Sequence, residues 1–411
     1  MTPSRRSPGA AGRRRPLKFR TDSAFQVELR RRVDAYFLTS GRRRRDCWQM
    51  YLKMAILIAC LAVSYVLLVF AAHAWWQSVP LAVLLGLTAA GIGFNVQHDG
   101  GHQAYSNHRL INKLMAMTLD LIGGSSYFWH WKHVVIHHTY VNVTGHDSDI
   151  NLGFLGRLTP HQPRLAFHRW QHLYLWPFYG LVAVRWHLVD DFRRLIAGRI
   201  GSYRVGRPTG GDLVLLLAGK AIFAFWAFGL PLLFHPVSAV LVHYGVAALV
   251  LGNALAVVFQ VAHCVGEAAF PLPSTDSGRI EQAWAIHQAE TTVDFARRNR
   301  VVAWLLGGLN FQIEHHLFPT ISHVNYPAIS KLVEQTCRDF GVAYAEHRSF
   351  REGVIAHFRW LRRMGIPTTP RGGEPREGAR NGNTSDVARR PRSAISVWPS
   401  GTSEVSTIYL I

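Results

Sequence analysis

The chain has 411 residues, of which 49% are hydrophobic, and it carries a formal net charge of +20. This balance is typical neither of an ordinary soluble enzyme nor of a bundle that is hydrophobic throughout. The four cysteines are scattered and show no Cys-x-x-Cys spacing: Cys47, Cys60, Cys264 and Cys337. They indicate neither a disulfide framework nor a thiolate metal site.

The first 47 residues form a basic segment, with fourteen Lys and Arg against four acids. Residues 26–45 predict a short helix that ends near Gly41 and whose apolar side could lie on a membrane surface. An arginine-rich arm could bind nucleic acid, but these charges adjoin an apolar span and no nucleic-acid module accompanies them. We therefore predict a cytoplasmic segment attracted to anionic membrane lipids, with no nucleic acid as a partner.

Four apolar segments predict transmembrane helices. Residues 54–72 form a run of 19 residues without a charge, which is long enough to cross ~30 Å of hydrocarbon. The other three segments are residues 80–96, 213–234 and 237–262. We expect an all-α, multi-pass integral membrane protein with about four spans and a membrane domain over 48–350. Residues 366–411 lack hydrophobic periodicity and predict a disordered tail.

Histidines gather in three clusters and at one isolated position. The first cluster is His98 and His102, the second is His133, His137 and His138, the third is Gln312, His315 and His316, and His263 stands alone. Imidazole suits iron, zinc, copper and nickel. A tetrahedral zinc site uses only three or four protein ligands, so nine candidates are too many for one ion and about right for two.

The spacing within each cluster supports this interpretation. Residues four apart on a helix share a face, so His98 and His102 can point together. His133 and His137 pair in the same way, which leaves His138 rotated away toward a second ion. Gln312, His315 and His316 can fan out from one face of a third helix.

The predicted topology brings the clusters to one side of the membrane. With a cytoplasmic N-terminus, the second span returns near residue 96 and ends at the first cluster. Residues 97–212 contain no convincing full span, and the fourth span ends at His263. We therefore expect a cytoplasmic, histidine-rich helical cap that holds a di-metal site, with both termini on the same side.

The clusters and the sequence stretches around them resemble those of the integral-membrane fatty acid desaturases. His-x3-His, His-x3-His-His and Gln-x2-His-His occur in that family's order. The third cluster resembles that of the front-end group, in which glutamine replaces the first histidine. The matching stretches are QHDGGH at 97–102, HHTYVN at 137–142, WAIHQAETTVDFA at 284–296 and GLNFQIEHHLFPTISHVNYPAI at 308–329. The resemblance covers about residues 50–345. The His-Pro-Gly-Gly haem motif of the cytochrome b5 domain that often accompanies such enzymes does not occur here.

The resemblance implies two iron ions, with O2 as co-substrate, and a double bond as the product. Iron is favoured over zinc because zinc has no redox chemistry, while an unactivated C–H bond calls for O2 activated on a metal. The resemblance also implies that His263, at the end of the fourth span, is a ligand. Gln312 would bind a metal directly or through water.

Other polar residues near the clusters could orient the ligands, because metal-bound histidines usually donate their second N–H to a carboxylate or carbonyl. The candidate acids are Asp99, Asp147, Asp149, Glu290, Asp294 and Glu314. Some of these acids could instead be ligands themselves. Four further histidines could bind a metal, orient the ligands or face the substrate: His130, His146, His287 and His323.

Three other functions remain open from the residues. A hydroxylase could use the same di-iron scaffold, and a zinc-dependent membrane hydrolase would need fewer histidines. The third is a non-catalytic membrane metal sensor or transporter. Transporters place ionisable residues at mid-membrane depth, whereas these histidines fall at the ends of spans.

The expected partners are an acyl substrate and an electron donor. The acyl group could be carried by CoA, a carrier protein or a lipid. The sequence contains no haem motif, flavin fingerprint or cysteine cluster, so we expect electrons from an external carrier such as ferredoxin or cytochrome b5. Such carriers are generally acidic, and Arg297, Arg298 and Arg300 are the candidates for docking them, or else membrane anchors.

Overall fold

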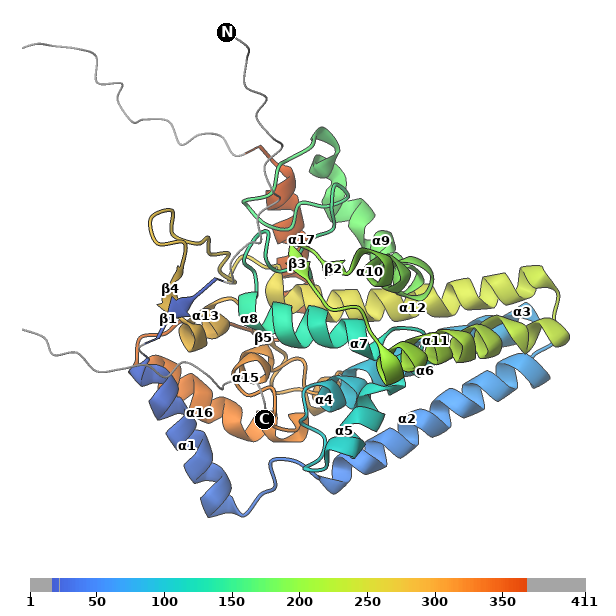
Figure 1. The fold of residues 1–411 in the computed structure, drawn as a ribbon, viewed down its shortest axis with the longest axis horizontal. Coiled ribbons are helices and arrows are strands. Elements are labelled where there is room, and N and C mark those ends of the chain that lie inside the picture. The colour runs from blue at the N-terminus through green and yellow to red at the C-terminus, as the bar shows by residue number, and fades with distance from the viewer. Residues whose placement is uncertain (1–16, 22, 368–411) are drawn as a thin grey trace, which may run out of the picture. The chain divides into compact units, whose positions relative to one another are not determined.

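Helices make up most of the protein, which we describe from a computed structural model over residues 17–21 and 23–367 (Figure 1). Four of them are long and apolar enough to cross a membrane: Trp48–Ala71, Trp75–Gly101, Gly210–Leu233 and Val237–His263. These helices agree with the four predicted spans and confirm the helical membrane fold. The proposed disordered tail lies outside the described residues from 368 onward.

The four spans are built from several labelled elements. The first is α2 (Trp48–Val66) with the π-helical turn Leu67–Ala71, and the second is α3 (Trp75–Ile92), the π-helical turn Gly93–Gln97 and α4 (His98–Gly101). The third is α11 (Gly210–Ala224), the π-helical turn Phe225–Gly229 and the 3-10 turn Pro231–Leu233, and the fourth is α12 (Val237–His263). Their outer faces expose large apolar side chains, among them Val63, Val66, Leu217 and Leu241, as lipid contact requires.

The helix α9 (Gln171–Arg185) packs along α12 without being a span by itself. The two backbones meet at Gly180 and Gly252, where a Cβ on Gly252 would lie 2.1 Å from the Gly180 carbonyl oxygen. Small residues permit such close helix contacts in membranes. This contact fixes the position of α12, and therefore of His263 at its end.

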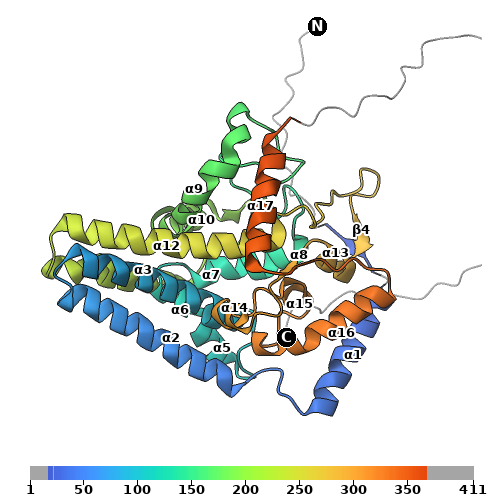
Figure 2. The same ribbon diagram turned by 180° about the vertical axis from the view of Figure 1, so that it is seen from behind.

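A group of shorter helices forms a cap at the ends of α4 and α12 (Figure 2). Before α9 it contains α5 (Arg109–Ala116), α6 (Thr118–Leu121), α7 (Ser126–Trp129), the π-helical turn His130–His137, α8 (His138–Tyr140) and the 3-10 turn Ala166–Trp170. After α9 come the π-helical turn Trp186–Asp190 and α10 (Asp191–Ala197). After α12 follow α13 (Trp284–Glu290), α14 (Arg300–Leu305), α15 (Gln312–Leu317), the 3-10 turn His323–Asn325, α16 (Tyr326–Asp339) and α17 (Phe350–Gly365).

Three short strand pairs tie the cap together. β1 (Phe19–Arg20) is parallel to β4 (Ile280–Ala283), and β5 (Asp294–Phe295) is parallel to β6 (Glu346–His347). β2 (Arg199–Ile200) and β3 (Tyr203–Arg204) form an antiparallel hairpin. The two parallel pairs join segments that are distant in sequence, whereas the hairpin is local.

The helix predicted near the N-terminus is α1 (Ala24–Ser40), which Gly41 ends in the left-handed conformation. Its apolar face was expected on a membrane surface, and that expectation is wrong. Phe25, Leu29, Val33 and Phe37 are buried, and α1 lies beside α16 (Figures 1 and 2). The hydrophobic gain of packing inside the cap therefore replaces contact with lipid.

The Gly180–Gly252 contact yields the first prediction. Gly252→Ala should destabilise the fold by about 1–3 kcal/mol, because the new methyl group overpacks the helix crossing. The measurement is the midpoint of thermal unfolding in detergent. Gly245→Ala is the matched control on the same helix, because no atom lies within 4 Å of its added Cβ. Equal midpoints for the two variants would contradict the close contact.

Candidate metal centre

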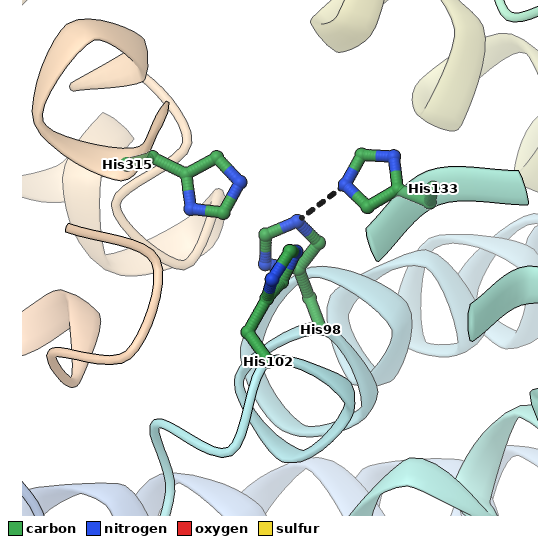
Figure 3. Close-up of side chains that lie close together, drawn as sticks. All are labelled: His98, His102, His133 and His315. Carbon is green, nitrogen blue, oxygen red and sulfur yellow. Dashed lines mark hydrogen bonds between the residues drawn. The ribbon is translucent and has the colours of Figure 1, made fainter. Parts of the chain in front are cut away.

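Eight buried or largely buried histidines from four segments converge at the ends of α4 and α12. Ligand nitrogens lie within 4.8 Å of one another in a group of four, His98, His102, His133 and His315, whose rings point toward a common centre (Figure 3). Two further groups consist of histidines alone: His137, His263 and His316, and His138, His315 and His316. A last group joins His133 and His137 to Asp149. The arrangement offers two neighbouring sites joined through His138 and His315.

The first cluster comes from the continuation of α3 through its π-helical turn into α4. The rings of His98 and His102 lie 4.7 Å apart between centroids, as the spacing predicted. Between them, Gly101 packs against Trp129, and a Cβ there would lie 2.2 Å from the indole ring. The indole in turn stacks on His133 at 4.7 Å. The glycine in the first motif is therefore needed for close packing of the first two clusters.

The second cluster lies on a π-helical turn, which sequence spacing did not indicate. His133 and His137 stack at 5.1 Å, but His133 joins the group of four and His137 joins His263 and His316. Nitrogens of His133 and His137 also lie within 4.8 Å of each other in a further group with Asp149, so the two rings come together as the spacing predicted while each also belongs to a different histidine group. A π-helix has more residues per turn than an α-helix, and such turns occur frequently at functional sites.

The third cluster lies on α15, where His315 and His316 face different groups. Ile313 N–H donates to Asp294 Oδ1 at 2.9 Å and fixes the first turn of this short helix. His263 reaches the site from the last residue of α12, with its ring 5.0 Å from that of His316. The isolated histidine thus lies within a ligand group, where the resemblance placed it.

Several inner ring nitrogens have no hydrogen-bond partner among the described residues. These include Nε2 of His102, His137 and His316 and Nδ1 of His138. Two pairs of Nε2 atoms face each other, His98 with His133 at 3.2 Å and His138 with His315 at 3.0 Å. Buried polar atoms are rarely left unsatisfied, and neutral imidazole nitrogens are good metal ligands. The residues therefore fit bound metal ions.

Outer ring nitrogens are held by partners that fix the orientation of the rings. His137 Nδ1 donates to Asp147 Oδ2 at 2.9 Å, and His316 Nδ1 lies 2.9 Å from Gln288 Oε1. Such contacts set the tautomer and leave Nε2 facing the metal. Asp147 was among the acids predicted, whereas Gln288 lies on α13 and no spacing relates it to His316.

The electrostatics keep most of these imidazoles neutral. Burial, reinforced by repulsion from neighbouring histidines, lowers the pKa of His138, His315 and His316 well below the usual range. Burial likewise lowers the pKa of His133 to about 4, despite its contact with Asp149. Burial also opposes the charge on His137, but Asp147 outweighs this effect and raises its pKa.

Comparison with known proteins agrees with this geometry. The fatty acid desaturase profile matches residues 74–348. The chain is 37% identical over 352 residues to the sn-1 linoleoyl-lipid 6-desaturase of Arthrospira platensis, covering 85% of this chain and 95% of that protein. It belongs to the fatty acid desaturase family.

Two further relatives extend the comparison. The sn-1 linoleoyl-lipid 6-desaturase of Synechocystis sp. is 35% identical over 350 residues, which cover 85% of this chain and 98% of that protein. The acyl-lipid (8-3)-desaturase of Physcomitrium patens is 37% identical over 346 residues, which cover 83% of this chain and 72% of that protein. The sequence resemblance to membrane desaturases is thereby confirmed.

A cavity of about 690 Å³ in this desaturase reaches the histidines. Its wall includes His98, His133, His263 and His315, together with Gln312. Gln312 is buried and lines the same space as the histidine groups. Its predicted role as a ligand, direct or through water, stays a prediction.

Several residues predicted to orient the ligands belong to other contacts. Asp99 binds the ring of His323, which also contacts Lys53 Nζ at 3.0 Å. His146 contacts Tyr203 Oη at 2.6 Å, and His130 is exposed. None of these side chains is in the groups of converging nitrogens. Asp99, His323 and His146 make contacts within the cap around the cluster.

The remaining predicted residues also lie outside those groups. Glu290 accepts from Gln282 at 2.5 Å, and His287 packs on Phe19 with ring centroids 5.0 Å apart. Tyr344 Oη donates to Asp294 at 2.6 Å and also lies 2.9 Å from Glu314. These contacts are made to residues other than the clustered histidines, and the expected role of these side chains in orienting ligands stays a prediction. The Tyr344 hydroxyl joins Asp294 to Glu314 on α15, which carries the third cluster.

Asp149 reaches the cluster more closely than the other predicted acids except Asp147. It lies 3.5 Å from His133 Nδ1 and forms an ion pair with Lys132. Burial alone would raise the pKa of this carboxyl, but Lys132 and the two neighbouring histidines, His133 and His137, hold it below its usual range. Asp149 is therefore a carboxylate that can accept a hydrogen bond from His133.

The Asp147 contact yields a prediction on metal affinity. Both carboxylate oxygens accept hydrogen bonds, from His137 and the Asn142 N–H on one side and from the Asp149 N–H on the other. Asp147→Asn would turn an NH2 group toward one of these donors. We expect metal affinity to fall about 10–100-fold, as for other altered partners of metal-bound histidines.

The measurement for this variant is metal retained after equilibration against a graded series of chelator concentrations. Asp276→Asn, on an exposed loop, is the control and should retain metal like the unaltered protein. Retention by Asp147→Asn that matches this control would show that Asp147 does not support the site.

Proposed function

We propose that this protein is an O2-dependent acyl-lipid desaturase whose eight histidines hold two iron ions. The observation that carries this proposal is the convergence of eight imidazoles, with several unpartnered ring nitrogens, at one wall of a cavity. The desaturase names of the relatives support an alkene product rather than the alcohol of a hydroxylase. Their acyl-lipid names support a lipid as the acyl carrier.

The number of ligands favours an oxygenase centre over the zinc alternatives. Structural and catalytic zinc sites use three or four protein ligands, about half of the histidines gathered here. A transporter would present its ionisable groups at mid-membrane depth. The ligand groups here instead include His98 and His263, at or near the ends of their spans.

The bound irons would supply the activation of O2 that breaks two unactivated C–H bonds. In the balanced reaction, the acyl chain loses two hydrogens, and two electrons and two protons from outside complete the reduction of O2 to two waters. His98, His102, His133 and His315 would hold one iron, and His137, His263 and His316 the other, with His138 between them. Asp147 and Gln288 keep two of these rings oriented.

The cavity wall supplies the binding surface for the chain. Apolar residues beside the histidines, including Phe94, Leu255 and Phe259, line it. Ile122 also lines a second, smaller cavity of about 60 Å³ among the spans. We propose that the acyl chain lies along the first cavity with its methyl end directed past Ile122. A cavity of this size with apolar lining residues suits a long apolar substrate.

The test is expression in a host that lacks polyunsaturated fatty acids, followed by mass-spectrometric mapping of new double bonds. The unaltered protein should yield a new alkene within lipid-bound acyl chains. His316→Ala should abolish product by removing a ligand while leaving membrane insertion intact. His130→Ala is the matched control because His130 is exposed, and it should keep most activity. Equal product from both variants would contradict the assigned ligands.

Gln312 gives a sharper test of the third cluster. Gln312→His should keep more activity and iron than Gln312→Ala, because histidine restores a nitrogen donor at the same position of α15. Iron content and product yield measured on both purified variants decide this. If both variants lose the same amount, Gln312 does not lie against a metal.

Electrons would come from an external acidic carrier, and the structure changes the predicted docking residues. Arg297 lies 2.6 Å from Glu346 and 2.9 Å from Glu334, and it is largely buried. Arg297 therefore connects the segment after β5 to β6 and α16, and its charge is not available for docking an electron carrier. Arg298 and Arg300 are exposed and remain candidates.

Reversing Arg298 and Arg300 to Glu should slow donor-dependent turnover several-fold and flatten its dependence on salt, because complementary charge mainly raises the encounter rate. Iron content should stay unchanged. Turnover measured across a salt series with ferredoxin or cytochrome b5 tests this. Unaltered kinetics would show that the electron donor does not dock at these arginines near the start of α14.

A further inference from the structure

The outer end of the large cavity is lined by arginines. We name four of them the arginine mouth: Arg185, Arg193, Arg194 and Arg199. They belong to α9, α10 and β2, and the same cavity is also lined by His98 and His263. One continuous space therefore joins a cationic end to the candidate metal centre.

Two of these arginines have no acidic partner among the described residues. Arg185 pairs with Asp190 at 3.0 Å and Arg194 with Asp191 at 3.1 Å, so their charges are compensated. Arg193 and Arg199 are exposed and form no such ion pair within the described part of the chain. Their guanidinium groups are free to bind an anion, and the planar fork of arginine suits phosphate oxygens.

The helical segment from α9 through α10 carries three of the four arginines of the mouth, and it has two faces of different chemistry. Val182, Arg185, Asp190, Arg193 and Arg194 line the cavity and recur at helical spacing. The other face exposes apolar side chains at a similar spacing, with Leu188, Phe192 and Ile196 exposed by 52%, 38% and 74%. An amphipathic segment of this kind lies at a membrane interface, with its apolar residues among the acyl chains.

Another part of the cavity lining is apolar. Ile122, Leu255 and Phe259 line the same space as the histidines, and the Phe259 ring lies 4.5 Å from that of His263. A ligand that fills the cavity would therefore carry a negative charge at one end and hydrocarbon at the other. It would also reach the site from the bilayer, because the mouth adjoins the exposed apolar face of α10.

We propose that Arg193 and Arg199 bind the phosphate of a membrane phospholipid, whose acyl chain then extends along the cavity to the histidines. This proposal rests on the proposed desaturase function and deepens it by assigning the headgroup of the acyl donor. The free guanidinium groups select a phosphate-bearing headgroup over an uncharged sugar headgroup. The apolar face of α10 favours a bilayer lipid over a water-soluble thioester.

The experiment measures binding apart from turnover. The purified metal-loaded protein in detergent is titrated, by native mass spectrometry, with phosphatidylglycerol, a neutral galactosyl diacylglycerol and an acyl-CoA, all carrying the same acyl chain. The unaltered protein should bind phosphatidylglycerol about tenfold or more tightly than the galactolipid, since charge-assisted hydrogen bonds are the strong ones. The protein should also bind phosphatidylglycerol more tightly than acyl-CoA.

The variant Arg193→Glu with Arg199→Glu should lose the preference for phosphatidylglycerol while keeping its metal. Arg351→Glu with Arg359→Glu, on exposed positions of α17 outside the cavity wall, is the matched control and should keep the preference. A preference retained by the mouth variant, or equal binding of the phospholipid and the galactolipid, would overturn the proposal. Tighter binding of acyl-CoA would overturn the assignment to a bilayer lipid.

A parallel assay separates this proposal from the proposed function. Each acyl donor is incubated with the protein, reduced ferredoxin and O2, and the products are analysed for double bonds. Absence of desaturation with every donor would reject the desaturase function even if the binding preference held. Desaturation of the galactolipid as fast as that of phosphatidylglycerol would reject the headgroup assignment while leaving the desaturase function in place.

Discussion

Packing eight imidazoles against one another, with several ring nitrogens unpartnered, is unfavourable unless metal ions satisfy those nitrogens. The rest of the structure depends on this constraint. A histidine nitrogen that binds a metal must be neutral and must point toward the metal. Burial lowers the pKa of most of these histidines, so that they stay neutral. Rigid helices keep the rings oriented, because a loop would let them turn away from the centre.

The membrane helices act as those supports. His98 and His263 lie at or near the ends of long spans. The close approach of Gly180 and Gly252 holds α9 against α12, the span that ends at His263. The cap supplies the remaining candidate ligands on short helices, and strand pairs connect the segments of this cap. Because its inner ligands face the cavity, the site can take a long apolar substrate from the side of the spans.

How far the sequence could predict the structure depended on whether a signal was local. The spans followed from uninterrupted apolar runs, and the clusters followed from histidine spacing. The additional membership of His133 and His137 in two different histidine groups did not, because the π-helical turn that carries both residues leaves no mark in the spacing. Gln288 and Tyr344 were also missed, since their contacts join α13 and the segment before β6 to elements distant in sequence. Arg297 and the apolar face of α1 were misread as surface features, because composition alone does not distinguish a solvent-facing or lipid-facing group from one covered by another part of the chain.

The central claim, two irons held in adjacent histidine groups, is tested most directly by Mössbauer spectroscopy of the purified protein loaded with ⁵⁷Fe, with iron counted on the same sample. The account predicts two irons per chain and the spectrum of a magnetically coupled pair. His316→Ala should lose that coupled signal. One iron per chain with no coupling, or a site that takes zinc and no iron, would contradict the account.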